Sequence, residues 1–98
     1  MRVRLLSSAA LDLRTGFAFF EEQEQGLGGY FLESILEDLK SLKTNAGIHS
    51  RVLGYHRKVA SVFPYGIYYR CSGDEIVVVA IFDSRQNPKL ITRNLRNR

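Results

Sequence analysis

The sequence predicts a two-layer α+β domain in which an N-terminal strand and an αα-hairpin pack on an antiparallel sheet of about four strands. The first observation is an uninterrupted apolar run at Ile76–Phe82, which is typical of a strand covered on both faces. The second is a pair of amphipathic helical patterns, and the third is the glycine-rich break between them. The helices carry the apolar stripes that the central strand needs as cover.

The strands are predicted from local composition. Gly66–Cys71 is rich in aromatic and β-branched residues, and Ser72–Asp74 follows as a tight turn before the apolar run. His56–Phe63 alternates loosely and precedes this hairpin, whereas Thr44–Gly54 is polar and is expected to be a loop. Arg2–Leu6 has the period of a half-buried strand, and we expect it to join the same sheet.

Two helices are predicted between the first strand and the loop. The first spans Ser8–Gln25, and its apolar stripe consists of Ala10, Leu13, Phe17 and Phe20. The second spans Gly29–Lys43, with a stripe of Phe31, Ile35, Leu39 and Leu42 and with Glu33, Glu37, Asp38 and Lys40 lying away from it. Because the connection is short, the helices should be antiparallel. By residue type, Phe17, Phe19 and Phe20 are expected in the core.

Length and composition indicate one domain over residues 1–98, ending in a basic tail at 86–98 with at most a helical turn. No window is long and apolar enough for a membrane span, and Met1–Ala10 is too short in its apolar part for a signal peptide. We therefore expect a cytoplasmic protein without a membrane partner. Cys71 is the only cysteine, so it forms no disulfide within the chain and is expected to be a buried strand residue.

The net charge of +4 is unevenly distributed. Residues 1–48 carry five Lys/Arg against seven Asp/Glu, a balance of −2, and residues 49–98 carry nine against three, a balance of +6. A basic half favours nucleic acid or an acidic protein segment as a partner. A basic tail that only keeps a small protein soluble accounts for the charge equally well.

Few residues point to chemistry. His49 and His56 have no cysteine or carboxylate cluster near them, so no metal site is predicted, and no glycine loop of the phosphate-binding type is present. No cofactor is implied. What remains is a basic and aromatic set: Arg57, Lys58, Tyr65, Tyr68, Tyr69, Arg70 and Arg85. Such a set can stabilise a phosphate without a metal or bind RNA, and it is also common on the solvent side of a sheet.

Several motifs in order resemble the ParE/RelE superfamily of type II toxin–antitoxin toxins. The likeness covers nearly the whole chain. Its parts are the opening Ala9–Leu13, the helix end Phe19–Gln23 with the break Gly26–Gly28 and Phe31, the pair Arg57-Lys58, the segment Phe63–Arg70, the run Val77–Ala80 and the segment Asp83–Pro88. The resemblance implies a compact sheet with a helical hairpin, in agreement with the fold predicted above.

The resemblance implies two alternative activities. ParE-like members inhibit DNA gyrase, and RelE-like members cut mRNA in the ribosome with basic residues and a late Tyr or His. This chain has Gly66 where RelE-like toxins carry an arginine, and no Tyr or His follows Tyr69. Loss of a proton-transfer group costs about 10²–10⁴ in rate, which favours the ParE-like alternative. If the nuclease alternative holds, the catalytic candidates are Arg85, Arg57, Lys58, His56 and Tyr68.

The resemblance also implies a cognate antitoxin, in a toxin–antitoxin complex that includes a heterotetramer as one possible assembly. The target is DNA gyrase in the first alternative, and the ribosome with its mRNA in the second. An antitoxin segment that folds along the toxin would suit the basic half of the chain. The residues expected to bind the antitoxin or the target are Arg70, Arg85, Lys89, Leu90 and Arg93, and the outer faces of the helices are further candidates.

Overall fold

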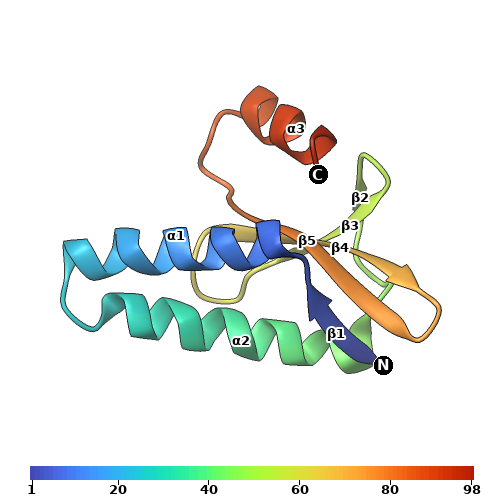
Figure 1. Cartoon of the computed structure of the whole chain (residues 1–98), viewed down its shortest axis with the longest axis horizontal. Coiled ribbons are helices and arrows are strands. Elements are labelled where there is room, and N and C mark those ends of the chain that lie inside the picture. The colour runs from blue at the N-terminus through green and yellow to red at the C-terminus, as the bar shows by residue number, and fades with distance from the viewer.

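The computed structural model describes all residues from 1 to 98. The elements are β1 (Arg2–Leu5), α1 (Ser7–Gln23), α2 (Leu27–Asn45), β2 (Arg51–Val52), β3 (Tyr55–Val59), β4 (Tyr65–Ser72), β5 (Glu75–Asp83) and α3 (Pro88–Arg96). The strands form one sheet in the order β1-β5-β4-β3-β2. Helices α1 and α2 lie together on one side of the sheet, and α3 stands apart from them beyond the end of β5 (Figure 1). No helix combines the length and the apolar character needed to cross a membrane.

The predicted α+β fold is confirmed, with two corrections to the sheet. It has five strands where about four were expected, and it is mixed, because β1 pairs with β5 in parallel while all other pairs are antiparallel. The additional strand β2 lies in the segment expected to be a loop. It is only two residues long, too short to show a period, and it pairs with β3 across Leu53 and Gly54, which both have positive φ.

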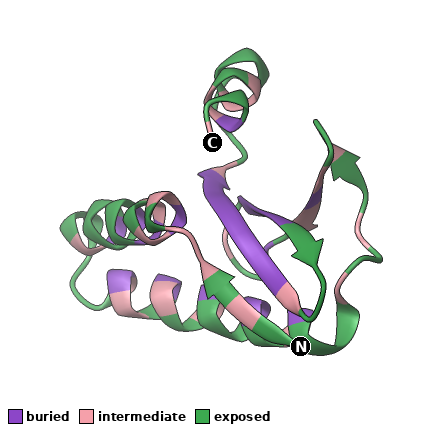
Figure 2. Cartoon of the chain, turned by 45° about the vertical axis from the view of Figure 1, so that its right-hand side comes forward, coloured by how far each residue is buried: buried purple, intermediate pink, exposed green.

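Strand β5 is buried along its whole apolar run, as predicted (Figure 2). Ile76, Val78 and Ile81 pack in a core of 14 buried residues shared with α1 and α2. Val77, Val79 and Phe82 pack in a second core of six buried residues on the opposite face. The second core contains Leu95 of α3, so the C-terminal helix covers a part of the sheet that the helical hairpin cannot reach.

The C-terminal segment is more ordered than the sequence indicated. We expected a basic tail with at most one helical turn, but Pro88–Arg96 forms a helix of nine residues. The Asn87 side chain accepts a hydrogen bond from the Lys89 N–H and so caps this helix, while Pro88 begins it. Leu95 is fully buried, and Ile91, one turn earlier, packs on the same core. Two apolar residues at helical spacing therefore hold a segment that is otherwise strongly basic.

The connection between α1 and α2 lies two residues earlier than expected and has the expected length, since α1 ends at Gln23 and α2 begins at Leu27. Gly26, in the predicted glycine-rich break, has a φ of +89°, a left-handed conformation that favours glycine. A Cβ on Gly28 would lie 2.6 Å from the carbonyl oxygen of Phe17, so this glycine permits the close approach of the helices. The carboxylate of Glu21 accepts hydrogen bonds from the N–H groups of Gly26 and Gly28, and thereby caps the start of α2 from the end of α1.

Three side chains that were expected to be buried are exposed, namely Phe17, Phe19 and Cys71. Phe17 is 37 % exposed and Phe19 is 49 % exposed, whereas Phe20 is buried as predicted. The buried face of α1 is formed by Ala9, Leu13, Gly16 and Phe20. The helix is thus rotated relative to the expected stripe, and Phe17 and Phe19 lie on either side of the buried face. Cys71 is the residue before the last of β4 and is also exposed, like its neighbours Arg70 and Ser72.

Candidate functional site

The structure places the five nuclease candidates on different surfaces. Arg57 and Lys58 are neighbours on β3 and therefore point to opposite faces of the sheet. The Lys58 ammonium lies on the α2 side, 3.9 Å from the Asp38 carboxylate. The Arg57 side chain lies on the other face, and its strand position is directly opposite Tyr68.

Two further candidates are largely enclosed. His56 is buried, its ring stacks on Tyr69 with centroids 5.1 Å apart, and its Nδ1 lies 2.8 Å from the His49 carbonyl oxygen. Tyr68 is only 2 % exposed and packs against Phe82.

Arg85 lies just beyond the end of β5, and its guanidinium forms an ion pair with the Asp83 carboxylate. Its Nε and one terminal nitrogen donate to the two carboxylate oxygens of Asp83, at 3.0 and 2.8 Å. The hydrogen bonds from Arg85 lower the pKa of the Asp83 carboxyl, against the opposing effect of burial. The five candidates therefore lie on two sheet faces and at a strand end, and they do not converge on one point.

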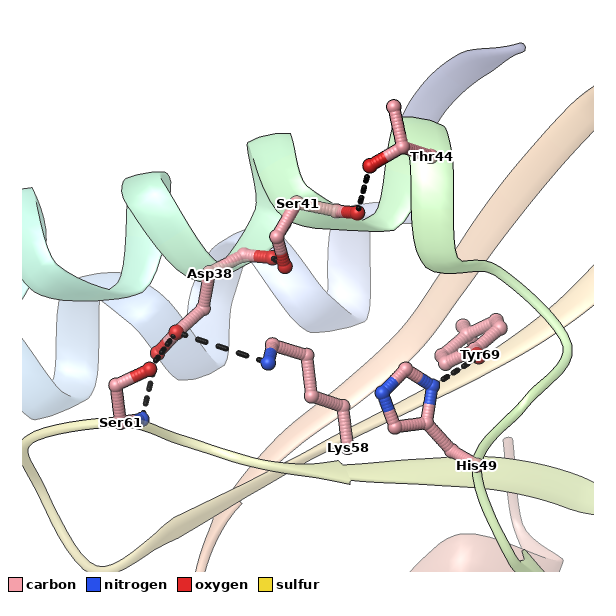
Figure 3. Close-up of polar contacts among 7 residues, drawn as sticks. All are labelled: Asp38, Ser41, Thr44, His49, Lys58, Ser61 and Tyr69. Carbon is pink, nitrogen blue, oxygen red and sulfur yellow. Dashed lines mark hydrogen bonds and ion pairs between the residues drawn. The ribbon is translucent and has the colours of Figure 1, made fainter.

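A polar cluster on the α2 side was not anticipated as a unit (Figure 3). The Tyr69 hydroxyl accepts a hydrogen bond from the Gly47 N–H and lies 2.5 Å from Nδ1 of His49. Burial lowers the pKa of His49, and the positive charge of Lys58 and the neighbouring His56 lower it further. The neutral imidazole can accept a hydrogen bond from the tyrosine hydroxyl, so these contacts fasten the loop after α2 to β4.

The same cluster contains Asp38, which the helical pattern had placed on the outer face of α2. Asp38 is instead 4 % exposed and accepts hydrogen bonds from the backbone N–H and the hydroxyl of Ser61. Its spacing of three from Ile35 and four to Leu42 was the signal for this position, because both neighbours are buried. The carboxylate joins α2 to the segment between β3 and β4 and also faces Lys58.

A second cluster lies where α1, the end of β5 and the C-terminus meet. The guanidinium of Arg98 donates to both carboxylate oxygens of Asp12, at 2.8 and 2.9 Å, and also to the Val79 carbonyl. A cleft of about 360 Å³ opens here, lined by Asp12, Thr15, Gly16, Phe19, Tyr65, Ile81, Phe82, Asp83, Gln86, Asn94 and Arg98. Burial and the nearby Asp83 carboxylate raise the pKa of Tyr65. Of these residues, only Tyr65 belonged to the basic and aromatic set that the sequence offered for chemistry.

The residues expected to bind an antitoxin or target are all exposed. Arg70 lies near the hairpin end of β4, and Lys89, Leu90 and Arg93 lie on the outer side of α3. Arg85 lies between these two groups along the chain. The structure thus puts these side chains on the surface, in two separate places.

An apolar groove runs along the outside of the helical hairpin. It has a volume of about 480 Å³ and is lined by Ala10, Leu13, Arg14, Phe17 and Leu32. One turn further along α2, Leu36 is 43 % exposed. Apolar side chains from two antiparallel helices thus remain in contact with solvent, an arrangement suited to an amphipathic helix of a partner.

The arrangement of the sheet and the helices defines the class of fold, and a solved structure has a similar fold. A chain in the structure of the chromosomal ParDE TA system from P. aeruginosa superposes with a TM-score of 0.76 and 23 % sequence identity. The match covers 85 % of this chain and 95 % of the other. No protein-family model and no curated protein sequence matches this chain. The fold implied by the ParE/RelE resemblance is therefore confirmed by structure.

Proposed function

We propose that this chain is the toxin of a type II toxin–antitoxin module and is neutralised by a cognate protein antitoxin in the bacterial cytoplasm. The observation that carries the proposal is the superposition on a chain of a ParDE system over nearly the full length of both chains. The sequence motifs that resemble ParE/RelE toxins also support the proposal, since they follow one another from Ala9 to Pro88.

The antitoxin contacts this chain in two chemically different ways in our proposal. An amphipathic helix places its apolar side in the groove between α1 and α2, where Phe17 and Leu32 are accessible. Acidic side chains meet the basic second half of the chain, in which nine Lys/Arg oppose three Asp/Glu. A heterotetramer with the antitoxin is the assembly that we propose, and the mass of the co-purified complex tests it.

For the target we propose DNA gyrase, bound by protein–protein contact, in preference to ribosome-dependent cleavage of mRNA. The support is the dispersion of the candidate catalytic groups. Lys58 faces Asp38 and Arg85 is paired with Asp83, while Tyr68 is buried. A phosphoryl-transfer site needs its cations and its proton-transfer group around one phosphate.

The decisive experiment is inducible expression in a bacterium, with and without the adjacent small open reading frame. The proposal expects growth arrest by the chain alone, and rescue by the neighbouring gene product. Purified protein should then inhibit supercoiling by gyrase at micromolar concentrations and leave ribosome-bound mRNA intact in toe-printing. Normal growth on expression would contradict the toxin function, and A-site cleavage would establish the nuclease alternative.

A further inference from the structure

One guanidinium on the α3 side of the sheet lacks any partner within the chain. The Nε of Arg57 is buried and has no hydrogen-bond acceptor. A charged donor left unsatisfied in this way is costly, and native proteins rarely keep one without a reason. The position of Arg57 is therefore the place at which a ligand would restore a missing interaction.

Gly66 creates the space in which Arg57 lies. A Cβ at Gly66 would come within 3.4 Å of Cγ and Cδ of Arg57 and within 3.2 Å of Cε1 of Tyr68. The aliphatic part of Arg57 thus packs beside Gly66. The absence of a side chain at 66, which weakens the resemblance to the nucleases, leaves room next to the stem of Arg57 and the ring of Tyr68.

Other cationic side chains of the chain do have carboxylate partners, and these pairs lie in other parts of the structure. Lys58 faces Asp38, Arg85 is paired with Asp83, and Arg98 is paired with Asp12. On the sheet face of Arg57, Glu75 forms ion pairs with Arg2 and Arg4 at the far edge strand. Arg57 is separated from that carboxylate by the width of β4 and β5, according to the order of strands. No acidic side chain within the chain forms an ion pair with Arg57.

A second free arginine lies close by. Arg57 is directly opposite Tyr68 on β4, and Arg70 follows two residues later on the same face. The Cα atoms of such diagonal neighbours on paired strands are about 7–8 Å apart. Arg70 is exposed and forms no ion pair. The face thus offers one half-buried and one exposed arginine on adjacent strands.

We propose that Arg57 binds a carboxylate of an acidic segment of the antitoxin, with Arg70 as a second contact. This inference rests on the proposed function, which supplies the partner. The surroundings favour a carboxylate over the backbone of a nucleic acid. Single-stranded nucleic acid is held by successive cations and by exposed rings on which bases stack, but the ring beside Arg57, Tyr68, is 2 % exposed. A planar guanidinium in a partly apolar setting matches a single carboxylate in two-pronged geometry.

The test uses the full chain and the purified product of the adjacent open reading frame. Arg57→Met keeps the aliphatic stem over Gly66 and removes the charge. Arg51→Met is the matched control, because Arg51 is an exposed arginine of β2 with no ion pair. We expect Kd to rise at least about 30-fold for Arg57→Met, as for loss of one partner of a buried charge pair, and less than about threefold for Arg51→Met. Thermal melting verifies that both variants fold.

A charge exchange identifies the partner group. Arg57→Glu should abolish binding, and replacement of one acidic residue of the partner by arginine should restore it. The inference would be overturned if Arg57→Met and the unmodified chain bound the partner with equal affinity. It would also be overturned if Arg57→Met lost binding to a short single-stranded RNA while its binding to the partner stayed unchanged. If the unmodified chain does not bind the partner at all, the proposed function fails, which is a distinct result.

Discussion

Arg98, the last residue, is joined to Asp12 in the first helix by two hydrogen bonds of 2.8 and 2.9 Å. The pair is mostly buried, with 18 % and 15 % of the side chains exposed. Asp12 also accepts a hydrogen bond from the Ile81 N–H, and the guanidinium of Arg98 lies 4.8 Å from the centre of the Phe82 ring. One ion pair therefore ties the C-terminal helix, the first helix and the central strand together.

Removal of this ion pair should loosen α3. Arg98→Met is expected to lower the free energy of unfolding by about 3 kcal/mol, because it leaves the Asp12 carboxylate buried without its counter-charge. Urea denaturation measures the loss, and limited proteolysis should cut within 88–98 faster than in the unmodified chain. Arg96→Met is the control on the same helix, since Arg96 is exposed and in no ion pair. An equal effect of both variants would contradict the prediction.

The helical hairpin should depend on Glu21. Glu21→Ala is expected to destabilise the fold by about 1–2 kcal/mol, because the N–H groups of Gly26 and Gly28 lose their acceptor at the start of α2. Chemical denaturation measures this change in the free energy of unfolding. Glu22→Ala, an exposed neighbour in the same helix, should change stability by less than about 0.5 kcal/mol. If Glu21→Ala is as mild as Glu22→Ala, the cap has no energetic role.

Stability should decrease in mild acid through His49. Its pKa is lowered in the folded state from 6.5, so below that pH the unfolded chain binds the proton first and the folded state loses stability. We expect a lower Tm at about pH 5.5 than at about pH 7.5. His49→Gln cannot titrate and should show a smaller difference between the two conditions. An unchanged difference would show that other groups cause the pH dependence.

The groove on the helical hairpin should be needed for antitoxin binding and not for folding. Phe17→Lys places a charge in the groove. Because Phe17 is 37 % exposed and the aliphatic stem of a lysine can cover part of the same surface, the free energy of unfolding should fall by only about 1 kcal/mol. Affinity for the product of the adjacent gene should fall at least about tenfold. Leu11→Lys is the control, since Leu11 is 55 % exposed on α1 and does not line the groove. Equal binding by Phe17→Lys would remove the groove from the proposed interface.

Most of the candidate site depends on long-range contacts that the sequence does not display. The pairing of Arg98 with Asp12 spans 86 positions, and the Asp38 to Ser61 contact spans 23. His56 was a catalytic candidate in the nuclease alternative, and the structure buries it in a stack with Tyr69. Arg57 was one cation among several in the sequence. Only the positions of Gly66 and Tyr68 show that its Nε is enclosed and unpaired.

Local patterns determined the type and order of the long elements. An apolar run such as Ile76–Phe82 must be covered on both faces, and two helical stripes separated by glycines must form a hairpin, because burial and backbone geometry act over a few residues. The tertiary structure alone decided the parallel pairing of β1, the two-residue strand β2 and the helix at Pro88–Arg96. These depend on which surfaces remain uncovered once the sheet has formed. The same reason explains why Phe17 lines an open groove while Leu95, in a basic tail, is buried.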